Sequence, residues 1–204
     1  MVVMAHGFSA TITMTTDRYA EVFAAHGLAV LLYDHRGFGR SGGEPRHSIN
    51  PWVQARGYRD ALTCAASLPG VDGQRVALWG DSFSGSVALV VAGVDDRVAA
   101  VVVQAPATGW ENRATRVTPR TPVPFHAGLA APHIRCPALV QLSPDDEMAG
   151  ADPVIARAVA ESIAGPTEIR EIDGGHFGLL HYPSQWFDDA VRTQVEFFAR
   201  AFAP

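Results

Sequence analysis

The sequence predicts an α/β fold: a doubly wound, mostly parallel sheet of about six strands with helices on both faces. Two observations predict it. Short apolar or β-branched segments alternate with helical segments along the chain, and within the apolar segments polar residues do not alternate with apolar ones. Continuous apolar character is typical of strands covered on both faces, as in a parallel sheet. The predicted strands are residues 2–5, 29–33, 75–79, 99–103, 138–142 and 168–172.

Helices are predicted between and after these strands, over residues 16–26, 53–68, 83–93, 152–164 and 184–202. The fourth helix has a strong start signal, because Asp152 is a good N-cap and Pro153 fits the first helical position. The last helix has apolar residues at helical spacing. Its side chains predicted to face the core are Trp186, Phe187, Val191, Val195 and Phe198.

The 204 residues, 48% of them hydrophobic and 18% charged, are predicted to form a single domain over residues 1–204. Residues 106–132 interrupt the alternation of strands and helices. This segment has little periodicity and holds prolines at positions 106, 119, 122, 124 and 132. We expect it to form a short irregular lid segment over the carboxyl edge of the sheet.

The charge pattern excludes several classes of partner. The formal net charge is -5 and Lys and Arg form no cluster, so neither nucleic acid nor a membrane surface is an expected partner.

The longest apolar runs, residues 87–92 and 98–103, are far shorter than the roughly 20 residues of a membrane-spanning helix. The first residues contain no basic region and no signal-peptide cleavage site, so a cytoplasmic location is the default expectation.

Residues 75–89 carry the strongest signal for a reactive residue. A predicted strand runs into a turn at Gly80-Asp81-Ser82, and an apolar helix leaves this turn directly. Such a turn exposes a serine hydroxyl at the helix N-terminus, where backbone amides and the helix dipole favour a developing negative charge. Ser82 is therefore the candidate nucleophile, and a purely structural turn is the competing interpretation.

Small residues flank Ser82, because neighbouring backbone segments of so sharp a turn come into contact. The usual pattern is Gly-x-Ser-x-Gly. Gly80 matches its first position, but Ser84 replaces its last, and a glycine follows one residue later at Gly85. Serine is also small, so the departure is mild. Ser84 is the weaker candidate for the nucleophile, since we expect it to lie inside the helix.

His176 is the candidate base. It lies in a glycine-rich loop, residues 172–178, directly after the last predicted strand. The carboxyl ends of parallel strands meet at the edge of the sheet where Ser82 is expected, and sites in doubly wound folds form there. An ordinary surface histidine is the competing interpretation, and His181 is the competing base.

An acid should follow the fifth predicted strand, where both Asp145 and Asp146 lie. A carboxylate is needed there to hold the imidazole in the tautomer whose free nitrogen accepts the serine proton. We prefer Asp146 as this acid. The competing interpretation is that both are turn residues, since Ser-Pro-Asp-Asp is typical of turns.

Two backbone amides are needed to form an oxyanion hole. One is expected from Phe83, directly after the nucleophile, and the other from Phe8 in the loop after the first strand. Gly7 allows that loop to turn toward the site, and His6 is expected to support the loop by hydrogen bonding rather than to transfer protons.

No metal and no cofactor is expected. The eight histidines form no His-Glu-x-x-His pattern, and the two cysteines are too few for a zinc site. Neither a phosphate loop nor a dinucleotide fingerprint occurs in the sequence.

These motifs resemble those of the α/β-hydrolase superfamily, and in particular bacterial serine esterases similar to dienelactone hydrolases and acetyl esterases. The resemblance covers nearly the whole chain. The matching segments are the His-Gly oxyanion loop at residues 6–8, the Asp-x-Arg-Gly-x-Gly-x-Ser turn at 34–41, the nucleophile elbow at 80–85 and the histidine loop at 175–177.

The order Ser82, Asp146, His176 is the one found in this superfamily. Asp146 falls where the family's acid follows Gly-x-x-Asp, although Ser143 replaces that glycine. The resemblance implies a serine hydrolase that cleaves small carboxylic esters through this triad and an acyl-enzyme intermediate. A thioesterase, lactonase, amidase or C–C hydrolase with the same triad is an alternative, as is a non-catalytic protein of this fold that binds a ligand or a partner.

The sequence departs from the family in two places. The family usually has two additional strands before the His-Gly strand, which starts here at Val2, so residues 29–33 are expected to form an exposed sheet edge. A homodimer through this edge is the expected assembly. Many relatives also carry a helical cap, for which only residues 106–132 are available here. We therefore expect a minimal cap, a shallow open pocket and small substrates.

Overall fold

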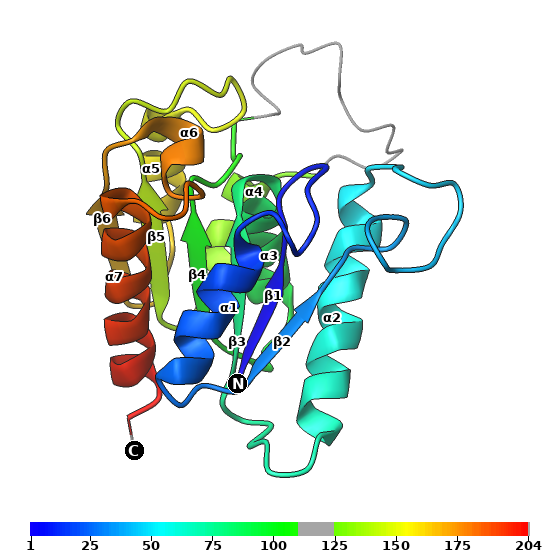
Figure 1. Cartoon of the computed structure of the whole chain (residues 1–204). Coiled ribbons are helices and arrows are strands. Elements are labelled where there is room, and N and C mark those ends of the chain that lie inside the picture. The colour runs from blue at the N-terminus through cyan, green and yellow to red at the C-terminus, as the bar shows by residue number, and fades with distance from the viewer. Residues whose placement is uncertain (110–124, 204) are drawn as a thin grey trace.

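The computed structural model describes residues 1–109 and 125–203, which form a six-stranded sheet with helices on both faces (Figure 1). The strands lie in the order β2-β1-β3-β4-β5-β6, and every neighbouring pair is parallel. The predicted fold class is confirmed. The strands are β1 (Val2–Ala5), β2 (Val30–Tyr33), β3 (Val76–Asp81), β4 (Val98–Gln104), β5 (Ala138–Leu142) and β6 (Thr167–Glu171).

Helices cover both faces of the sheet (Figure 1). One face packs against α2 (Pro51–Ser67), α3 (Ser82–Val94) and α5 (Pro153–Glu161), and the other against α1 (Thr16–Ala25) and α7 (Gln185–Ala201). Successive side chains of β1, β3 and β4 mostly enter opposite hydrophobic clusters, which is why these strands are largely apolar. Of the five residues of the edge strand β6, only Ile169 joins a cluster. Three short elements complete the described chain: α4 (Ala127–Ala130), the 3-10 turn η1 (Ala131–His133) and α6 (Gly175–Gly178).

The predicted elements lie close to the observed ones. Residues 2–5 and 138–142 are reproduced to the residue, and Asp152 caps α5 by accepting a hydrogen bond from the Val154 amide at 2.9 Å. Strand β3 continues past the predicted end at residue 79, so that it includes Asp81. Among the helices of the described ranges, none is long and apolar enough to cross a membrane.

Of the predicted lid segment, residues 106–132, the structure describes residues 106–109 and 125–132, and the rest lies outside the described residues. The described end of this segment forms α4 and η1, which contact α3. Neither element was expected from the sequence, since each is too short to show helical periodicity.

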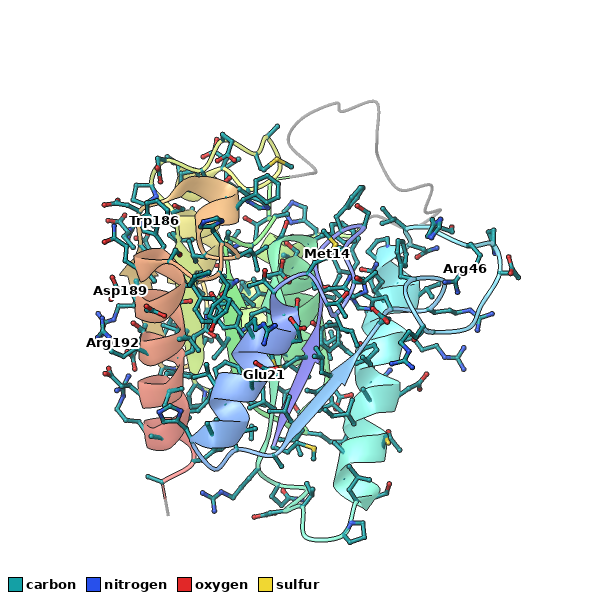
Figure 2. The ribbon with its side chains drawn as sticks, in the orientation of Figure 1. Met14, Glu21, Arg46, Trp186, Asp189 and Arg192 are labelled. Carbon is teal, nitrogen blue, oxygen red and sulfur yellow. The ribbon has the colours of Figure 1, made fainter. Side chains whose placement is uncertain are left out.

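Trp186 does not face the core, which corrects one expectation for the last helix. Phe187, Val191 and Phe198 are buried as predicted, and Val195 is partly buried against the same cluster. Trp186 is only half-buried and lies where α7 begins, next to α6 (Figure 2). A Cβ added to Gly174 would come within 2.9 Å of its indole ring. Trp186 therefore covers the turn that carries His176, a contact that helical periodicity alone does not predict.

A buried glutamine joins α7 to the centre of the sheet. The side-chain oxygen of Gln194 accepts a hydrogen bond from the Trp79 indole at 2.8 Å. Its nitrogen donates to the side-chain oxygens of Gln104 at 2.9 Å and Gln141 at 2.5 Å. Gln194 is fully buried, so these hydrogen bonds replace the ones that its amide would otherwise form with water.

Replacing Gln194 by leucine leaves the indole of Trp79 without its acceptor in a dry environment. We expect the free energy of unfolding to fall by about 2–3 kcal/mol. Urea titration followed by tryptophan fluorescence measures this change. Gln185→Leu, at an exposed position of the same helix, is the matched control and should change stability by less than about 0.5 kcal/mol. Equal midpoints for the two variants would contradict this account of the network.

Strand β2 is one edge of the sheet, as predicted from the sequence, and it pairs only with β1 among the described strands. Its four residues are all apolar and half-buried. The Val2 amide donates to the Ala29 carbonyl, so by the parallel register the Leu32 amide points away from β1. Such an apolar edge is suited to pairing with another strand.

The homodimer through β2 stays a prediction, which sedimentation equilibrium can test. We expect the wild type to dimerise and Leu32→Pro to remain monomeric with an unchanged circular dichroism spectrum, because proline removes an outward amide and is tolerated on an edge strand. A monomeric wild type would refute the dimer.

Candidate active site

Ser82 lies in the sharp turn between β3 and α3, as the first residue of the helix. Its φ is +50°, a left-handed conformation that non-glycine residues rarely adopt. The turn leaves no room beside it: a Cβ on Gly80 would lie 2.5 Å from the Ser84 carbonyl oxygen, and a Cβ on Gly85 would lie 3.2 Å from the Cβ of Pro106. These contacts explain why the sequence has glycine at both positions.

The structure brings Ser82, His176 and Asp146 together in a chain of hydrogen bonds. The Oγ of Ser82 lies 2.8 Å from Nε2 of His176, and Nδ1 of His176 lies 2.8 Å from Oδ2 of Asp146. The side chains of His176 and Asp146 are 3% and 1% exposed. Because Nδ1 faces a carboxylate, it carries the ring proton, which leaves Nε2 as the acceptor for the serine hydroxyl.

Asp145 and Asp146 point in different directions and do different things. Oδ1 of Asp145 accepts hydrogen bonds from the amides of Gly174 at 3.2 Å and Gly175 at 3.0 Å and from the Ser143 hydroxyl at 2.9 Å. The bond from Gly175 is the main reason why the pKa of Asp145 is lowered. Asp145 therefore ties the loop after β5 to the turn that carries His176, while Asp146 faces the imidazole.

A second carboxylate holds the same turn. Oε2 of Glu147 accepts a hydrogen bond from the His176 amide at 2.9 Å, which lowers the pKa of Glu147. The sequence predicted an irregular loop here, whereas the structure has the short helix α6. Gly174 and Gly175 enter it with φ of +122° and +70°, conformations in which other residues are strained.

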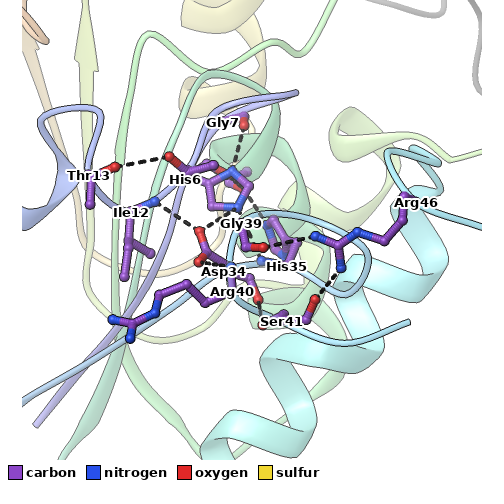
Figure 3. A network of polar contacts seen from close by, with 12 residues as sticks. His6, Gly7, Ile12, Thr13, Asp34, His35, Gly39, Arg40, Ser41 and Arg46 are labelled. Atoms are coloured by element: carbon purple, nitrogen blue, oxygen red, sulfur yellow. Dashed lines mark hydrogen bonds and ion pairs between the residues drawn. The ribbon is translucent and has the colours of Figure 1, made fainter. Parts of the chain in front are cut away.

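The loops after β1 and β2 are joined by buried polar contacts (Figure 3). Asp34, in the turn after β2, accepts hydrogen bonds from the amides of Ile12 at 3.0 Å and Arg40 at 2.9 Å. A Cβ on Gly39 would lie 2.2 Å from Oδ2 of Asp34, so this turn requires glycine. The Asp-x-Arg-Gly-x-Gly turn thus has a structural role and supports the loop in which His6 and Phe8 lie.

Ser84, which replaces the glycine of the usual pattern, connects His6 and His35. Its hydroxyl donates to the carbonyl oxygen of His6 and lies 2.7 Å from Nε2 of His35, which must then be the protonated nitrogen. The His35 amide donates to Nε2 of His6 at 3.1 Å, so His6 carries its proton on Nδ1, 2.9 Å from the Gly7 carbonyl oxygen. Burial lowers the pKa of both histidines, which favours these neutral forms.

Replacing Ser84 by alanine removes the hydroxyl that bonds to the His35 ring nitrogen and to the His6 carbonyl oxygen. We expect a loss of about 1–3 kcal/mol in the free energy of unfolding. Ser86→Ala is the matched control: Ser86 is also buried in α3, but its hydroxyl has no hydrogen-bond partner among the described residues, so its removal should cost less than about 0.5 kcal/mol. Chemical denaturation of both variants measures the difference, and equal losses would argue against a connecting role for Ser84.

The two segments expected to supply oxyanion amides lie together. The rings of Phe8 and Phe83 make an edge-to-face contact with centroids 5.5 Å apart. A Cβ on Gly7 would lie 3.2 Å from the Cβ of Ser82. The loop after β1 is therefore pressed against the turn that carries Ser82, with room only for glycine at the contact.

A pocket of about 410 Å³ opens over Ser82 and His176. His181 lines this pocket and is exposed, whereas His176 is the histidine that bonds to Ser82. The sequence reasoning missed the buried carboxyl group of Asp81 on the pocket wall. A larger cavity of about 890 Å³ lies between β2 and α2 and is lined by none of Ser82, Asp146 and His176. The pocket over Ser82 is lined by Gly7, Phe8, Ser9, Ala10, Met14, Thr15, Thr16, Asp81, Ser82, Met148, His176, Phe177, Leu180 and His181.

A parallel sheet in which a central strand ends at a left-handed serine before a helix, with a histidine after the last strand, defines the class of α/β hydrolases. The chain belongs to the family described as serine aminopeptidase, S33 (Hydrolase_4), which matches residues 1–171. The resemblance to the α/β-hydrolase superfamily inferred from the motifs is thus confirmed.

Three comparisons illustrate the relationship. The chain is 40% identical over 121 residues to the quorum-quenching protein AidA of Acinetobacter baumannii (strain MDR-ZJ06), a match that covers 59% of this chain and 40% of AidA. It is 43% identical over 106 residues to the thiohydrolase apmlB of Arthrinium phaeospermum, covering 52% of this chain and 34% of apmlB. The matched segments thus span two fifths or less of these relatives.

The crystal structure of the α/β hydrolase GrgF from Penicillium sp. sh18 superposes on the chain with a TM-score of 0.83 at 23% identity. The superposition covers 100% of this chain and 90% of GrgF. At this identity the likeness establishes the fold.

Proposed function

We propose that the protein is a serine hydrolase that cleaves small carboxylic esters through an acyl-enzyme intermediate. The observation that carries this proposal is the chain of hydrogen bonds from Ser82 through His176 to Asp146, with both steps 2.8 Å long. The left-handed conformation of Ser82 supports the same role, because strained backbone of this kind is concentrated at reactive residues.

In this mechanism His176 takes the proton of Ser82 while the hydroxyl oxygen attacks the ester carbonyl. The backbone amides of Phe83 and Phe8 donate to the oxyanion that forms. His176 then gives its proton to the departing alcohol. A water molecule, deprotonated by the same histidine, hydrolyses the acyl-enzyme and restores Ser82. Asp146 keeps the imidazole oriented and stabilises its charged form throughout.

The pocket supports a small or medium-sized acyl group. Its volume of about 410 Å³ lies at the lower end of the usual range for small-molecule sites. Met14 and Phe177 on its rim are largely exposed, at 58% and 59%, so the entrance is open and apolar. The acyl chain would lie against these side chains.

Thioester hydrolysis is the second candidate, supported by the relatives that are named thiohydrolases and are 39% to 43% identical over the matched segments. The same triad serves both reactions, because the attack on the carbonyl is the same. Comparing kcat/KM for p-nitrophenyl acetate and its sulfur analogue, S-(p-nitrophenyl) thioacetate, shows whether the protein prefers the ester or the thioester.

Replacing Ser82 by alanine should abolish hydrolysis of p-nitrophenyl acetate and butyrate, with kcat lower by roughly 10⁶-fold. Ser86→Ala is the control that should retain activity, because Ser86 lies about one helical turn after Ser82 and its hydroxyl has no hydrogen-bond partner in the described ranges. Labelling by a fluorophosphonate probe, present in the wild type and lost in Ser82→Ala, identifies the nucleophile directly. An inactive, unlabelled wild type would favour a ligand-binding protein of the same fold.

Asp145 and Asp146 allow a matched test of the acid. Asp146→Asn should lower kcat by roughly 10⁴-fold, because the amide no longer enforces the required tautomer of His176. Asp145→Asn should lower it by less than about tenfold, since the amide oxygen can still accept hydrogen bonds from Gly174 and Gly175. Steady-state kinetics with p-nitrophenyl acetate measures both, and the reverse order would exchange the two roles.

A further inference from the structure

Asp81 is a buried carboxyl group that the mechanism above does not use. It is the residue before Ser82, it is only 3% exposed, and it lies on the wall of the same pocket. Within the described parts of the chain, its Oδ1 has no hydrogen-bond partner. An unsatisfied oxygen is costly for a buried carboxylate, so its presence beside the nucleophile calls for a functional explanation.

The carboxyl group of Asp81 is packed against the loop that carries Phe8. A Cβ on Gly7 would lie 2.7 Å from Oδ2 of Asp81 and 3.3 Å from its carbonyl oxygen. The backbone amides of Gly7 and of Asp81 lie close enough to this carboxyl group to favour its charged form and lower its pKa. The loop after β1 therefore rests on Asp81 at the point where the chain turns toward Ser82.

Three titratable side chains of the surrounding elements interact electrostatically with this carboxyl group. His176 comes from α6, Tyr19 from α1 and Tyr58 from α2. The tyrosine hydroxyls donate to the carbonyl oxygens of Leu179 at 2.6 Å and Trp79 at 2.8 Å, so neither donates its proton to Asp81.

Burial decides the protonation of Asp81. It raises the pKa of this carboxyl group to about 7, although His176 and the backbone amides of Gly7 and Asp81 act in the opposite direction. The group is therefore neutral on the acid side of neutrality and charged on the alkaline side.

We propose that Asp81 is a positioning residue: its neutral carboxyl group holds the loop of Gly7 and Phe8 against Ser82, and its ionisation weakens the stabilisation of the oxyanion. The inference rests on the proposed function. A neutral carboxyl group packs against Gly7 without opposing the negative charge that develops nearby. A carboxylate at the same place repels that charge in an environment from which water is largely excluded.

The pH dependence of kcat for p-nitrophenyl acetate tests this role in the wild type and in Asp81→Asn. We expect the wild-type kcat to fall by at least about tenfold as the pH rises through about 7, and this alkaline decrease to be absent in the variant. Asparagine has nearly the same shape and keeps the packing against Gly7, but it has no charge to lose. The same alkaline decrease in both proteins, or none in the wild type, would overturn the proposal.

Asp81→Ala separates positioning from charge. Without the carboxyl group the loop loses its support, and we expect kcat to fall by about 10²-fold at every pH with little change in KM. Rescue of this loss by asparagine but not by alanine supports positioning. Unchanged kcat in a folded Asp81→Ala variant would overturn it.

A measurement that does not depend on hydrolysis distinguishes this inference from the proposed function. The amide resonances of Gly7 and Phe8 should shift with a midpoint near pH 7 in the wild type and lose that transition in Asp81→Asn. His176 is present in both proteins, so the difference between them reports Asp81 alone. If the wild type lacks esterase activity, the proposed function fails. Identical titrations in the two proteins would refute the coupling of Asp81 to the loop.

Discussion

The left-handed turn at Ser82 is the constraint on which the rest of the site depends. A residue with side chain held at positive φ costs of order 1–3 kcal/mol, and the surrounding structure must compensate for that cost. It does so through β3, which is buried on both faces, and α3, which is almost entirely buried. The turn places one hydroxyl at the carboxyl edge of the sheet, and the loops after β1, β5 and β6 converge on it.

Much of this arrangement could be predicted from the sequence because it follows from local patterns. Apolar segments without alternation indicate strands covered on both faces, and their carboxyl ends lie at one edge in a parallel sheet. Ser82 directly follows β3 and His176 lies in the turn after β6, so their proximity follows from topology. Asp145 and Asp146 could not be separated with the same certainty, because they share one loop and one chemistry and differ only in the direction of their side chains.

Other features depend on contacts that no local pattern contains. The four residues of α6 are too few to show helical periodicity, and Trp186 covers them only because α7 begins beside that turn. Ser84 looked like a mild departure from a glycine pattern, yet its hydroxyl is the atom through which α3 contacts both His6 and His35. The sequence indicated only that the side chain at position 84 must be small. The structure adds that its hydroxyl forms hydrogen bonds.

The hydrogen bonds that Asp145 and Glu147 accept from the turn of His176 have a consequence for how the protein responds to acid. These two carboxylates are exposed, whereas the sheet is stabilised by apolar packing. Hydrogen bonds hold the pKa of both groups below the ordinary value, so the stability that they contribute is lost as the pH falls through those lowered values. We therefore expect acid to loosen the turn that carries His176, while the apolar packing of the sheet has no such dependence on pH. Under the proposed mechanism, acid would disturb the site before it disturbs the fold.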